Sequence, residues 1–314
     1  MSTTEVDRRA HVHAADVAAI LGISPYASEW SKWAEKVGLY TPEHSDEMLE
    51  RFEIGKDAEG FLADVFQRHH PEFRVGAQQA VLTNERWPWL VGHADAFLFD
   101  ALADAGPHHA VAGWEAKTDN DFTPWTEIPA HYQCQAQTYM MLSGYQRWWF
   151  TVGFAGWKVR HYCVEANAED QALIAERTEA FWQLVQTRVP PETDGTQATW
   201  DAIQSAYGHN PDAEDSLTAD SDMVTWVDQL RFWRSEQKAA GEHVAGLESK
   251  IKARMQDYAE LVGPDGSRLV TWKPSTSRRV DLDSLRAEHP EIVETYTTET
   301  TTRRFLVKTP KEDN

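Results

Sequence analysis

The chain has 314 residues, enough for one large domain or two ordinary ones. Its two cysteines exclude a disulfide scaffold and a four-cysteine iron–sulfur cluster. The apolar runs are too short to span a membrane and the chain starts without an apolar signal core, so we expect a cytoplasmic protein. The net charge of −20 argues at face value against a DNA-binding protein.

Tryptophan is abundant, with fourteen residues, and Trp30 and Trp33 flank Lys32 on the first predicted helix. Tryptophan can stack on unpaired bases, but packing in a core or a subunit contact is its commoner use, and we expect it for most of the fourteen. Candidates for the basic walls of a nucleic-acid groove, each of which also fits an ordinary surface charge, are Lys32, Lys36, Arg51, Lys56, Arg68 and Arg74.

A second helix is predicted over residues 52–66, where Gly55, Glu59, Leu62 and Phe66 form one stripe at helical spacing. Glu59 therefore lies on the inward face of this helix. For a lone glutamate, the edge of an amphipathic helix is the commoner interpretation. Gly55 costs helix stability relative to alanine, which suggests that another backbone or a ligand passes close to it.

Two apolar runs, 89–99 and 110–118, predict a pair of strands. Asp95 interrupts the first run, and a carboxylate in a buried strand is unfavourable unless a cation or a metal compensates it. In the second run, the alternation of strand side chains makes Glu115 and Lys117 point the same way.

The turn-forming segment 101–107 predicts that the two strands form an antiparallel hairpin. Positions 95 and 115 are equidistant from residue 105, so a symmetric hairpin places Asp95 directly across from Glu115. The two carboxylates can then bind one hard cation, and oxygen ligands favour Mg²⁺ or Mn²⁺ over Zn²⁺. Lys117 can orient or deprotonate an attacking water. This set of residues indicates metal-assisted phosphodiester hydrolysis.

The helix predicted after the hairpin carries Gln135 and Tyr139 on one face, and Gln133 and Gln137 on another. For the second pair we favour a solvated helix surface. A strand is predicted from residue 147 to residue 154.

Nine acidic residues and no Lys or Arg occupy the stretch from Val189 to Leu230, which holds nearly half of the excess negative charge. This uneven distribution weakens the objection to DNA binding. The stretch is most simply a linker or a solvated helix pair, and an acidic cover that competes with DNA is the alternative.

The C-terminal part contains a helical pattern over 223–262, broken near Gly241. Further predicted elements are a turn at 263–266, a strand at 269–273, a capped helix at 281–288 and a Thr-rich β segment at 295–308. No catalytic constellation occurs there, so oligomerisation, DNA handling and partner docking all remain open.

Together these motifs resemble the YqaJ-type viral recombinase family, which is lambda exonuclease-like and belongs to the PD-(D/E)XK nuclease superfamily. Besides the residues of the hairpin, segments 8–26, 55–59 and 131–140 resemble the family's opening helix, its first acidic helix and its glutamine-bearing helix. The resemblance covers residues 8–165 well and the remainder loosely. Each motif is weak alone, but their order and spacing are specific.

The resemblance implies an α/β (α+β) fold, with a nuclease core of one central mixed β-sheet flanked by helices and a C-terminal α+β extension. It implies a nuclease domain over 1–188, an acidic linker region over 189–222 and a helical and β extension over 223–314. The implied catalytic set is Asp95, Glu115, Lys117, Glu59 and Gln135. Asp95, Glu115 and the Ala116 carbonyl would bind the metal, and Glu59 would be a further ligand or would support the ligands.

For DNA binding the resemblance points to Arg8, His13 and Tyr132. Family members often carry a serine that joins an arginine, seven residues earlier, in binding a 5′ phosphate. Here the serine position is Ala15, and Arg8 fits the arginine position in competition with Arg9. His13 could supply the missing donor. Tyr132 would lie near the scissile phosphate or Lys117.

The expected function is a metal-dependent DNA exonuclease of phage-type homologous recombination, encoded by a bacterial host or by a prophage. By resemblance it resects linear double-stranded DNA from its ends, in the 5′ to 3′ direction, beside a single-strand annealing protein and as a ring-shaped homo-oligomer, a trimer. One alternative is a structure-specific or restriction-like endonuclease on the same core. The other is a non-catalytic, acidic DNA-mimicking or partner-binding protein, which has no need of the hairpin residues.

Overall fold

The computed structural model describes residues 8–43, 45–76, 80–101, 110–208, 216–299 and 302–308. The chain divides into two compact units, Met1–Gly208 and His209–Asn314. Within these described ranges, every helix is too short or too polar to cross a lipid bilayer.

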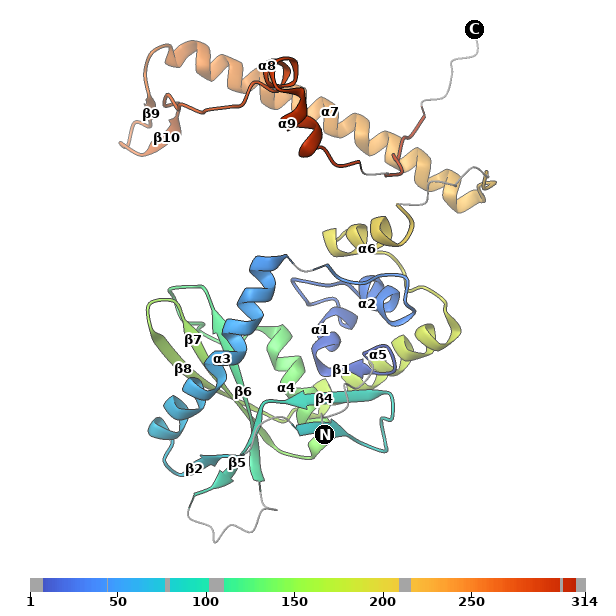
Figure 1. Ribbon diagram of the computed structural model, residues 1–314, viewed down its shortest axis with the longest axis vertical. Helices are drawn as coiled ribbons and strands as arrows, with labels where there is room; N and C mark the ends of the chain where they lie inside the picture. Colours follow the sequence, from blue (N-terminus) through green and yellow to red (C-terminus); the bar gives the residue numbers. More distant parts are fainter. Residues whose placement is uncertain are drawn as a thin grey trace. The chain divides into compact units, whose positions relative to one another are not determined.

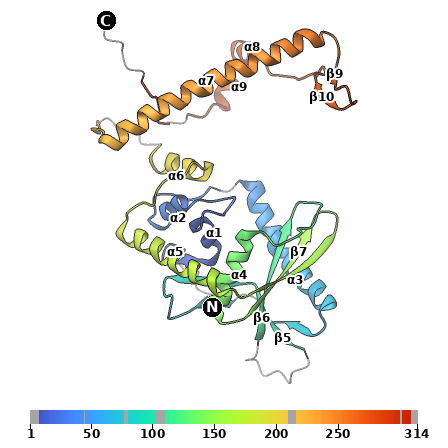
Figure 2. The same ribbon diagram turned by 180° about the vertical axis from the view of Figure 1, so that it is seen from behind.

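A five-stranded mixed sheet is the centre of the first unit (Figure 1). Its strands, in spatial order, are β2 (Phe73–Val75), β5 (Ala96–Asp100), β6 (Ala110–Asp119), β7 (Arg147–Phe154) and β8 (Lys158–Glu165). The β6–β7 pair is parallel, and the other three pairs are antiparallel. Helix α3 (Asp46–His69) packs on one face and α4 (Ala130–Ser143) on the other (Figure 2). The α/β core with a mixed sheet flanked by helices, predicted from the sequence, is confirmed.

A smaller sheet has the strand order β1-β4-β3, where β1 is Val12–His13, β3 is Ala80–Thr83 and β4 is Leu90–Ala94. Strand β1 pairs in parallel with β4. A 3₁₀ turn and helix α1 (Val17–Ile20) follow it directly. The opening helix expected over 8–26 is therefore only one turn long, because the chain before it is used for sheet pairing.

Two hydrophobic clusters cover the two faces of the five-stranded sheet. On the α3 side, Leu62 and Phe66 pack with Trp114 of β6. The larger cluster, on the α4 side, contains Trp148 and Phe150 of β7. The alternation predicted for the second apolar run is confirmed: Ala112, Trp114 and Ala116 of β6 face the α3 cluster, whereas Glu115 and Lys117 lie against residues of α4.

Helix α6 (Gln197–Tyr207) packs against α2 (Glu29–Lys36) and buries Thr199 and Ala202. Between α6 and the sheet, the chain runs through α5 (Ala168–Thr187). Part of the acidic stretch expected to be a linker is therefore an integral helix of the first unit, which extends to residue 208 rather than 188. The physical reason is the apolar face of α6, which net charge alone does not reveal.

The second unit contains α7 (Ser221–Met255), the hairpin β9–β10 (Glu260–Val262 and Arg268–Thr271), α8 (Leu282–Glu288) and α9 (Pro290–Thr295). The capped helix after Asp281 was predicted correctly. The break near Gly241 was wrong, since one glycine costs about 1 kcal/mol, which a helix of 35 residues tolerates. The β segment over 295–308 was also wrong: Thr295 ends α9, and residues 296–299 and 302–308 form no strand.

Candidate active site

Asp95 lies at the junction of two strands, not inside one. The apolar run 89–99, expected to be a single strand, is divided between β4 and β5, which belong to different sheets. A strand break at this position lets the carboxylate leave the apolar core that surrounds both strands. Of the predicted turn segment 101–107, residues 102–107 lie outside the described residues.

The register of the hairpin places Asp95 beside Glu115. Ala96 pairs with Trp114, so the next position on each strand brings the two acidic residues opposite one another. The Asp95 amide lies 3.4 Å from Glu115 Oε2, and Asp95 Oδ2 accepts a hydrogen bond of 2.9 Å from the Ala116 amide. The predicted juxtaposition of positions 95 and 115 is therefore present in the fold.

Lys117 lies on the same face of β6 as Glu115 and donates a 2.8 Å hydrogen bond from Nζ to Glu115 Oε1. Burial raises the pKa of Glu115 to about 7, and the negative charge of Asp95 adds to that rise, while Lys117 opposes it. Burial also raises the pKa of Asp95. Burial alone would lower the pKa of Lys117, but the neighbouring Glu115 and Asp95 carboxylates outweigh it and raise that pKa. One lysine thus only partly compensates the buried Glu115 carboxylate and the half-buried Asp95 carboxylate.

These residues fit a hard divalent cation. The raised carboxyl pKa values mark a place where further positive charge is favourable, and carboxylate oxygens are the ligands that Mg²⁺ and Mn²⁺ prefer. The N–H and C=O of one strand residue point to the same side. The Ala116 amide points to Asp95, on the edge of β6 away from β7. The Ala116 carbonyl therefore points to the same edge, toward Asp95.

Glu59 is half-buried on α3, and its pKa is raised by burial and by the negative charge of Asp95. In the part of the chain that the structure describes, no three His, Cys, Asp or Glu side chains are grouped closely enough to hold a metal ion. Glu59 therefore does not form a three-carboxylate set with Asp95 and Glu115. A Cβ at Gly55 would lie 3.7 Å from Thr118 Oγ1, an ordinary contact, so crowding does not require glycine there.

Helix α4 supports the site from the other side. Gln135 Nε2 lies 3.5 Å from Glu115 Oε1 and donates a 2.7 Å hydrogen bond to the Tyr139 hydroxyl. Tyr139 in turn donates a 2.7 Å hydrogen bond to the His93 carbonyl of β4. Lys117 Nζ lies 5.3 Å from the centre of the Tyr132 ring, a cation–π distance. The structure thus brings Gln135 and Tyr132 to Glu115 and Lys117.

The solvated surface expected for Gln133 and Gln137 is wrong for Gln137, which is buried. Its side chain donates a hydrogen bond to the Glu165 carbonyl and accepts one from the Asn167 amide. It connects α4 to the end of β8. Gln133 is half-buried and donates to the Ile128 carbonyl.

At the N-terminal segment, His13 is buried and its ring stacks on His93, with centroids 5.3 Å apart and planes 7° from parallel. Burial lowers the pKa of His13 to about 4, and the positive charge of Arg8 contributes to that shift. The Nε2 atom of His13 is buried without a hydrogen-bond partner. Ala15 is exposed. Arg8 and His13 are thus close to each other, and His93 belongs to the same strand end as Asp95.

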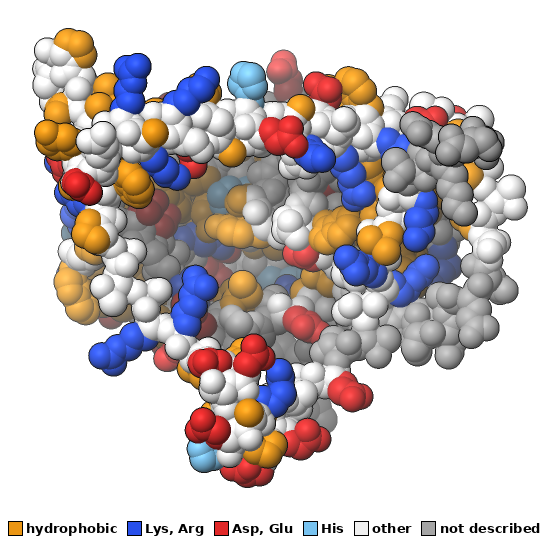
Figure 3. Space-filling view, turned by 90° about the horizontal axis from the view of Figure 1, so that it is seen from above, with side chains coloured by type: hydrophobic (Ala, Val, Ile, Leu, Met, Phe, Trp, Pro, Cys, Tyr) orange, Lys and Arg blue, Asp and Glu red, His pale blue; other side chains and the backbone are white. Residues whose placement is uncertain are grey.

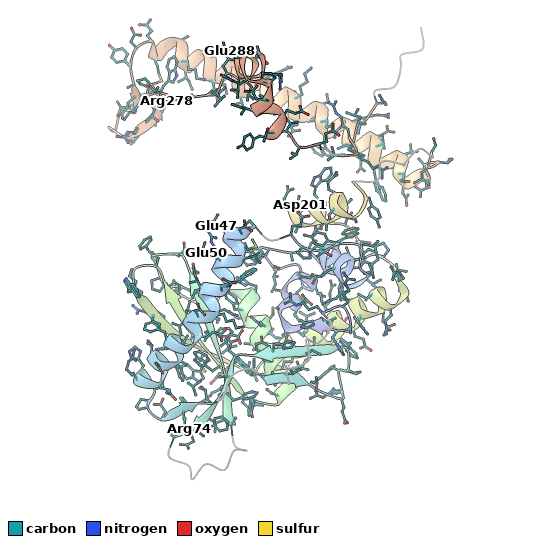
Figure 4. All side chains as sticks on the ribbon, in the orientation of Figure 1. Glu47, Glu50, Arg74, Asp201, Arg278 and Glu288 are labelled. Carbon is teal, nitrogen blue, oxygen red and sulfur yellow. The ribbon has the colours of Figure 1, made fainter. Side chains whose placement is uncertain are left out.

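Lys32 and Lys36, two of the candidates for the basic walls of a nucleic-acid groove, pair with an acidic residue of the protein itself. Asp16 is buried, with Lys36 Nζ 2.7 Å from Oδ2 and Lys32 Nζ 3.2 Å from Oδ1. Arg74 projects from β2, over the Phe99 ring at 5.1 Å (Figure 4). Arg51 pairs with Glu47 on the exposed side of α3.

Sequence reasoning missed His93 and His131. The ring of His131 lies 4.1 Å from Tyr132, its Nε2 is buried without a partner, and its pKa is lowered by burial and by the charge of Lys117. His93 precedes Asp95 by only two residues, and this closeness in the sequence could have identified His93 as a neighbour of the site. His131 directly precedes Tyr132, but only the fold places it near Lys117.

Residues 5–146 match the model of the YqaJ-like viral recombinase domain. The chain is similar to the uncharacterized protein YqaJ of Bacillus subtilis (strain 168), with 25% identity over 312 residues that cover 96% of this chain and 92% of that protein.

Two solved structures match part of this chain. The alkaline exonuclease LHK-Exo of Laribacter hongkongensis has 15% identity and a TM-score of 0.44, over 58% of this chain and 90% of that chain. A phage-related exonuclease of Haemophilus somnus 129PT has 11% identity and a TM-score of 0.43, over 57% of this chain and 95% of that chain. Residues 5–146 of the chain are thus similar to the YqaJ-like viral recombinase domain.

Proposed function

We propose that this protein is a metal-dependent DNA exonuclease that resects linear duplex DNA in phage-type recombination, in the 5′ to 3′ direction. The observation that carries the proposal is the set of the buried Glu115 with the half-buried Asp95 and Lys117, which contact one another where β4 ends and β5 begins. The match of residues 5–146 to the model of the YqaJ-like viral recombinase domain supports a recombination role. The proposal includes a single-strand annealing partner and a ring-shaped trimer.

The residues divide the chemistry between them. Asp95, Glu115 and the Ala116 carbonyl would hold Mg²⁺ or Mn²⁺, which when bound would polarise the phosphodiester and acidify a water. Lys117 would orient the attacking water. Gln135, anchored through Tyr139 to β4, would keep the Glu115 carboxylate in place.

Linear and covalently closed duplex DNA distinguish the proposed function from its alternatives. We expect Mg²⁺-dependent conversion of linear duplex to single strand and mononucleotides, while closed circles survive, because an exonuclease needs an end. The measurement is gel and chromatographic product analysis with Mg²⁺ or with EDTA. Rapid cutting of closed circles would establish the endonuclease alternative, and inertness on both substrates would favour the non-catalytic one.

The preference for a 5′ phosphate should depend on the N-terminal segment. Arg8→Ala keeps the main-chain carbonyl that accepts from Lys36 but removes the guanidinium near His13. A charge-assisted donor to phosphate is worth about 1.5 to 3 kcal/mol, roughly tenfold to a hundredfold in rate. We expect Arg8→Ala to lower the ratio of initial resection rates on 5′-phosphorylated over 5′-hydroxyl ends, and Ala15→Ser to raise it.

Arg160→Ala, at an exposed arginine of β8, is the matched control and should leave the ratio unchanged. If the rate ratio is unchanged in both Arg8→Ala and Ala15→Ser, Arg8 does not bind the 5′ phosphate. It would leave the Asp95 and Glu115 site untouched, because absolute hydrolysis is measured in the same reactions.

A further inference from the structure

Trp157 is 94% exposed, more than any other large hydrophobic side chain in the part of the chain that the structure describes. Exposed hydrophobic side chains are common in this protein, and the space-filling view shows some of them lying among Lys and Arg (Figure 3). Trp157 differs from them because its side chain is almost completely open to solvent. Burial of its ring therefore contributes almost nothing to the stability of the fold.

The backbone of Trp157 is also unfavourable for a residue with a side chain. Trp157 belongs to the loop between Phe154, the last residue of β7, and Lys158, the first residue of β8. Its φ is 63°, in the left-handed region that favours glycine or asparagine. A glycine at this position would cost less free energy, because its backbone adopts a positive φ without a steric clash. Neither packing nor loop geometry explains a tryptophan here.

A second open aromatic side chain lies beside this loop. Phe122 is 70% exposed. A Cβ built on Gly156 would lie 3.5 Å from Phe122 Cδ1, so the phenyl ring contacts the loop. Lys158 donates a 2.6 Å hydrogen bond from Nζ to the Phe122 carbonyl, which joins the two segments. The Lys158 ammonium keeps further N–H donors for an external acceptor. The loop therefore combines two open aromatic rings with a cation.

The loop lies beyond the end of the strand that carries Glu115 and Lys117. Asp119 ends β6 two residues after Lys117, and it pairs with Phe154, which directly precedes the loop (Figure 1). At about 3.3 Å per residue, the loop is roughly 10 to 15 Å from Lys117. A strand of DNA advances about 3.4 Å per nucleotide, so a strand held at the site reaches the loop within roughly three to five nucleotides.

An unpaired nucleobase is the ligand that these features fit. Every base has a flat face that stacks on an aromatic ring, and bases offer that face to a protein where the strand is single. Asp119 and Asp121 are close to the same loop, since the Ala155 amide donates to the Asp121 carbonyl. Their negative charge offsets that of Lys158. Stacking, rather than attraction to phosphate, would therefore supply most of the binding energy.

We propose that Trp157 and Phe122 stack on an unpaired base of single-stranded DNA next to the candidate active site. This binding role rests on the proposed function for its choice of DNA as the ligand.

The test measures the affinity of the full-length chain for a fluorescein-labelled oligothymidylate, by fluorescence anisotropy in EDTA. Stacking on one base is worth about 1 to 3 kcal/mol, so Trp157→Gly should weaken binding roughly fivefold to a hundredfold. The loss should persist at high salt, and Trp157→Phe, which keeps an aromatic ring, should bind nearly as the wild type does. Trp200→Ala, at a 52% exposed tryptophan of α6, is the matched control and should bind normally.

Thermal unfolding separates lost stacking from a damaged fold. Trp157→Gly should melt at or above the temperature of the wild type, because glycine suits the positive φ of this position. A clearly lower melting temperature would show that the ring stabilises the fold, and it would overturn the proposal. Wild-type affinity in Trp157→Gly, an equal loss in Trp200→Ala, or a wild type that does not bind the oligothymidylate would also overturn it.

Hydrolysis of linear duplex DNA with Mg²⁺, measured for the same chains, distinguishes this proposal from the proposed function. A wild type that hydrolyses DNA, with unchanged oligothymidylate affinity in Trp157→Gly, would overturn the stacking role alone. A wild type that binds the oligothymidylate through Trp157 but hydrolyses no DNA would support the stacking role and overturn the nuclease assignment.

Discussion

Glu115→Gln or Lys117→Ala is expected to reduce Mg²⁺-dependent hydrolysis by about a thousandfold or more while the protein stays folded. Metal-ion stabilisation of a phosphodiester transition state is worth several kcal/mol, and each ~1.4 kcal/mol is a factor of ten in rate. Glutamine keeps the shape of the Glu115 side chain but removes the charge that would hold the cation. Lys117→Ala removes the ammonium that contacts Glu115 at 2.8 Å.

The fold should survive Glu115→Gln because burial already disfavours the Glu115 carboxylate, as its raised pKa indicates. Thermal unfolding checks this point, and Mg²⁺ titration calorimetry checks the loss of metal binding. Glu165→Gln, at an exposed carboxylate of β8, is the matched control and should keep full activity. Cleavage at near wild-type rate by a folded Glu115→Gln or Lys117→Ala chain would refute the assignment of the site.

Asp16→Asn is expected to reduce the free energy of unfolding by about 3 to 5 kcal/mol, the usual effect of breaking a buried ion pair from one side. Asp16 is buried between Lys32 and Lys36, and the Lys36 side chain is only 1% exposed. Without the carboxylate, Lys36 would keep a buried charge with no opposite charge beside it. Urea unfolding followed by tryptophan fluorescence measures the change. Glu47→Gln, in the exposed pair with Arg51, should cost at most about 1 kcal/mol.

The pH dependence gives a second test of Asp16. Burial alone would raise its pKa, but Lys32 and Lys36 outweigh burial and hold that pKa well below the ordinary 3.8. A lowered pKa in the folded state means that the stabilisation is fully present above about pH 4 and is lost as the pH falls below it. The stability difference between wild type and Asp16→Asn should therefore be constant near neutral pH and shrink in acid. A difference that grows on acidification would contradict the ion-pair explanation.

The sequence by itself determined the residues of the candidate site and their relation. Alternation along a strand is a local property, so Glu115 and Lys117 had to share a face. The symmetric register was predicted from the equal distances of Asp95 and Glu115 from the turn. The observed pairing of Ala96 with Trp114 has this register. The helix carrying Glu59 followed from its apolar spacing.

Only the tertiary structure decided which environment each polar residue occupies, because burial depends on elements that are distant in the chain. Strand β1 pairs with β4, and that pairing brings His13 onto His93 and limits the opening helix to one turn. Lys32 and Lys36 were candidates for the walls of a nucleic-acid groove. Because α2 packs on α1, both lysines instead form ion pairs with Asp16. Gln137 is buried because β8 ends beside α4, a contact that helical spacing cannot reveal.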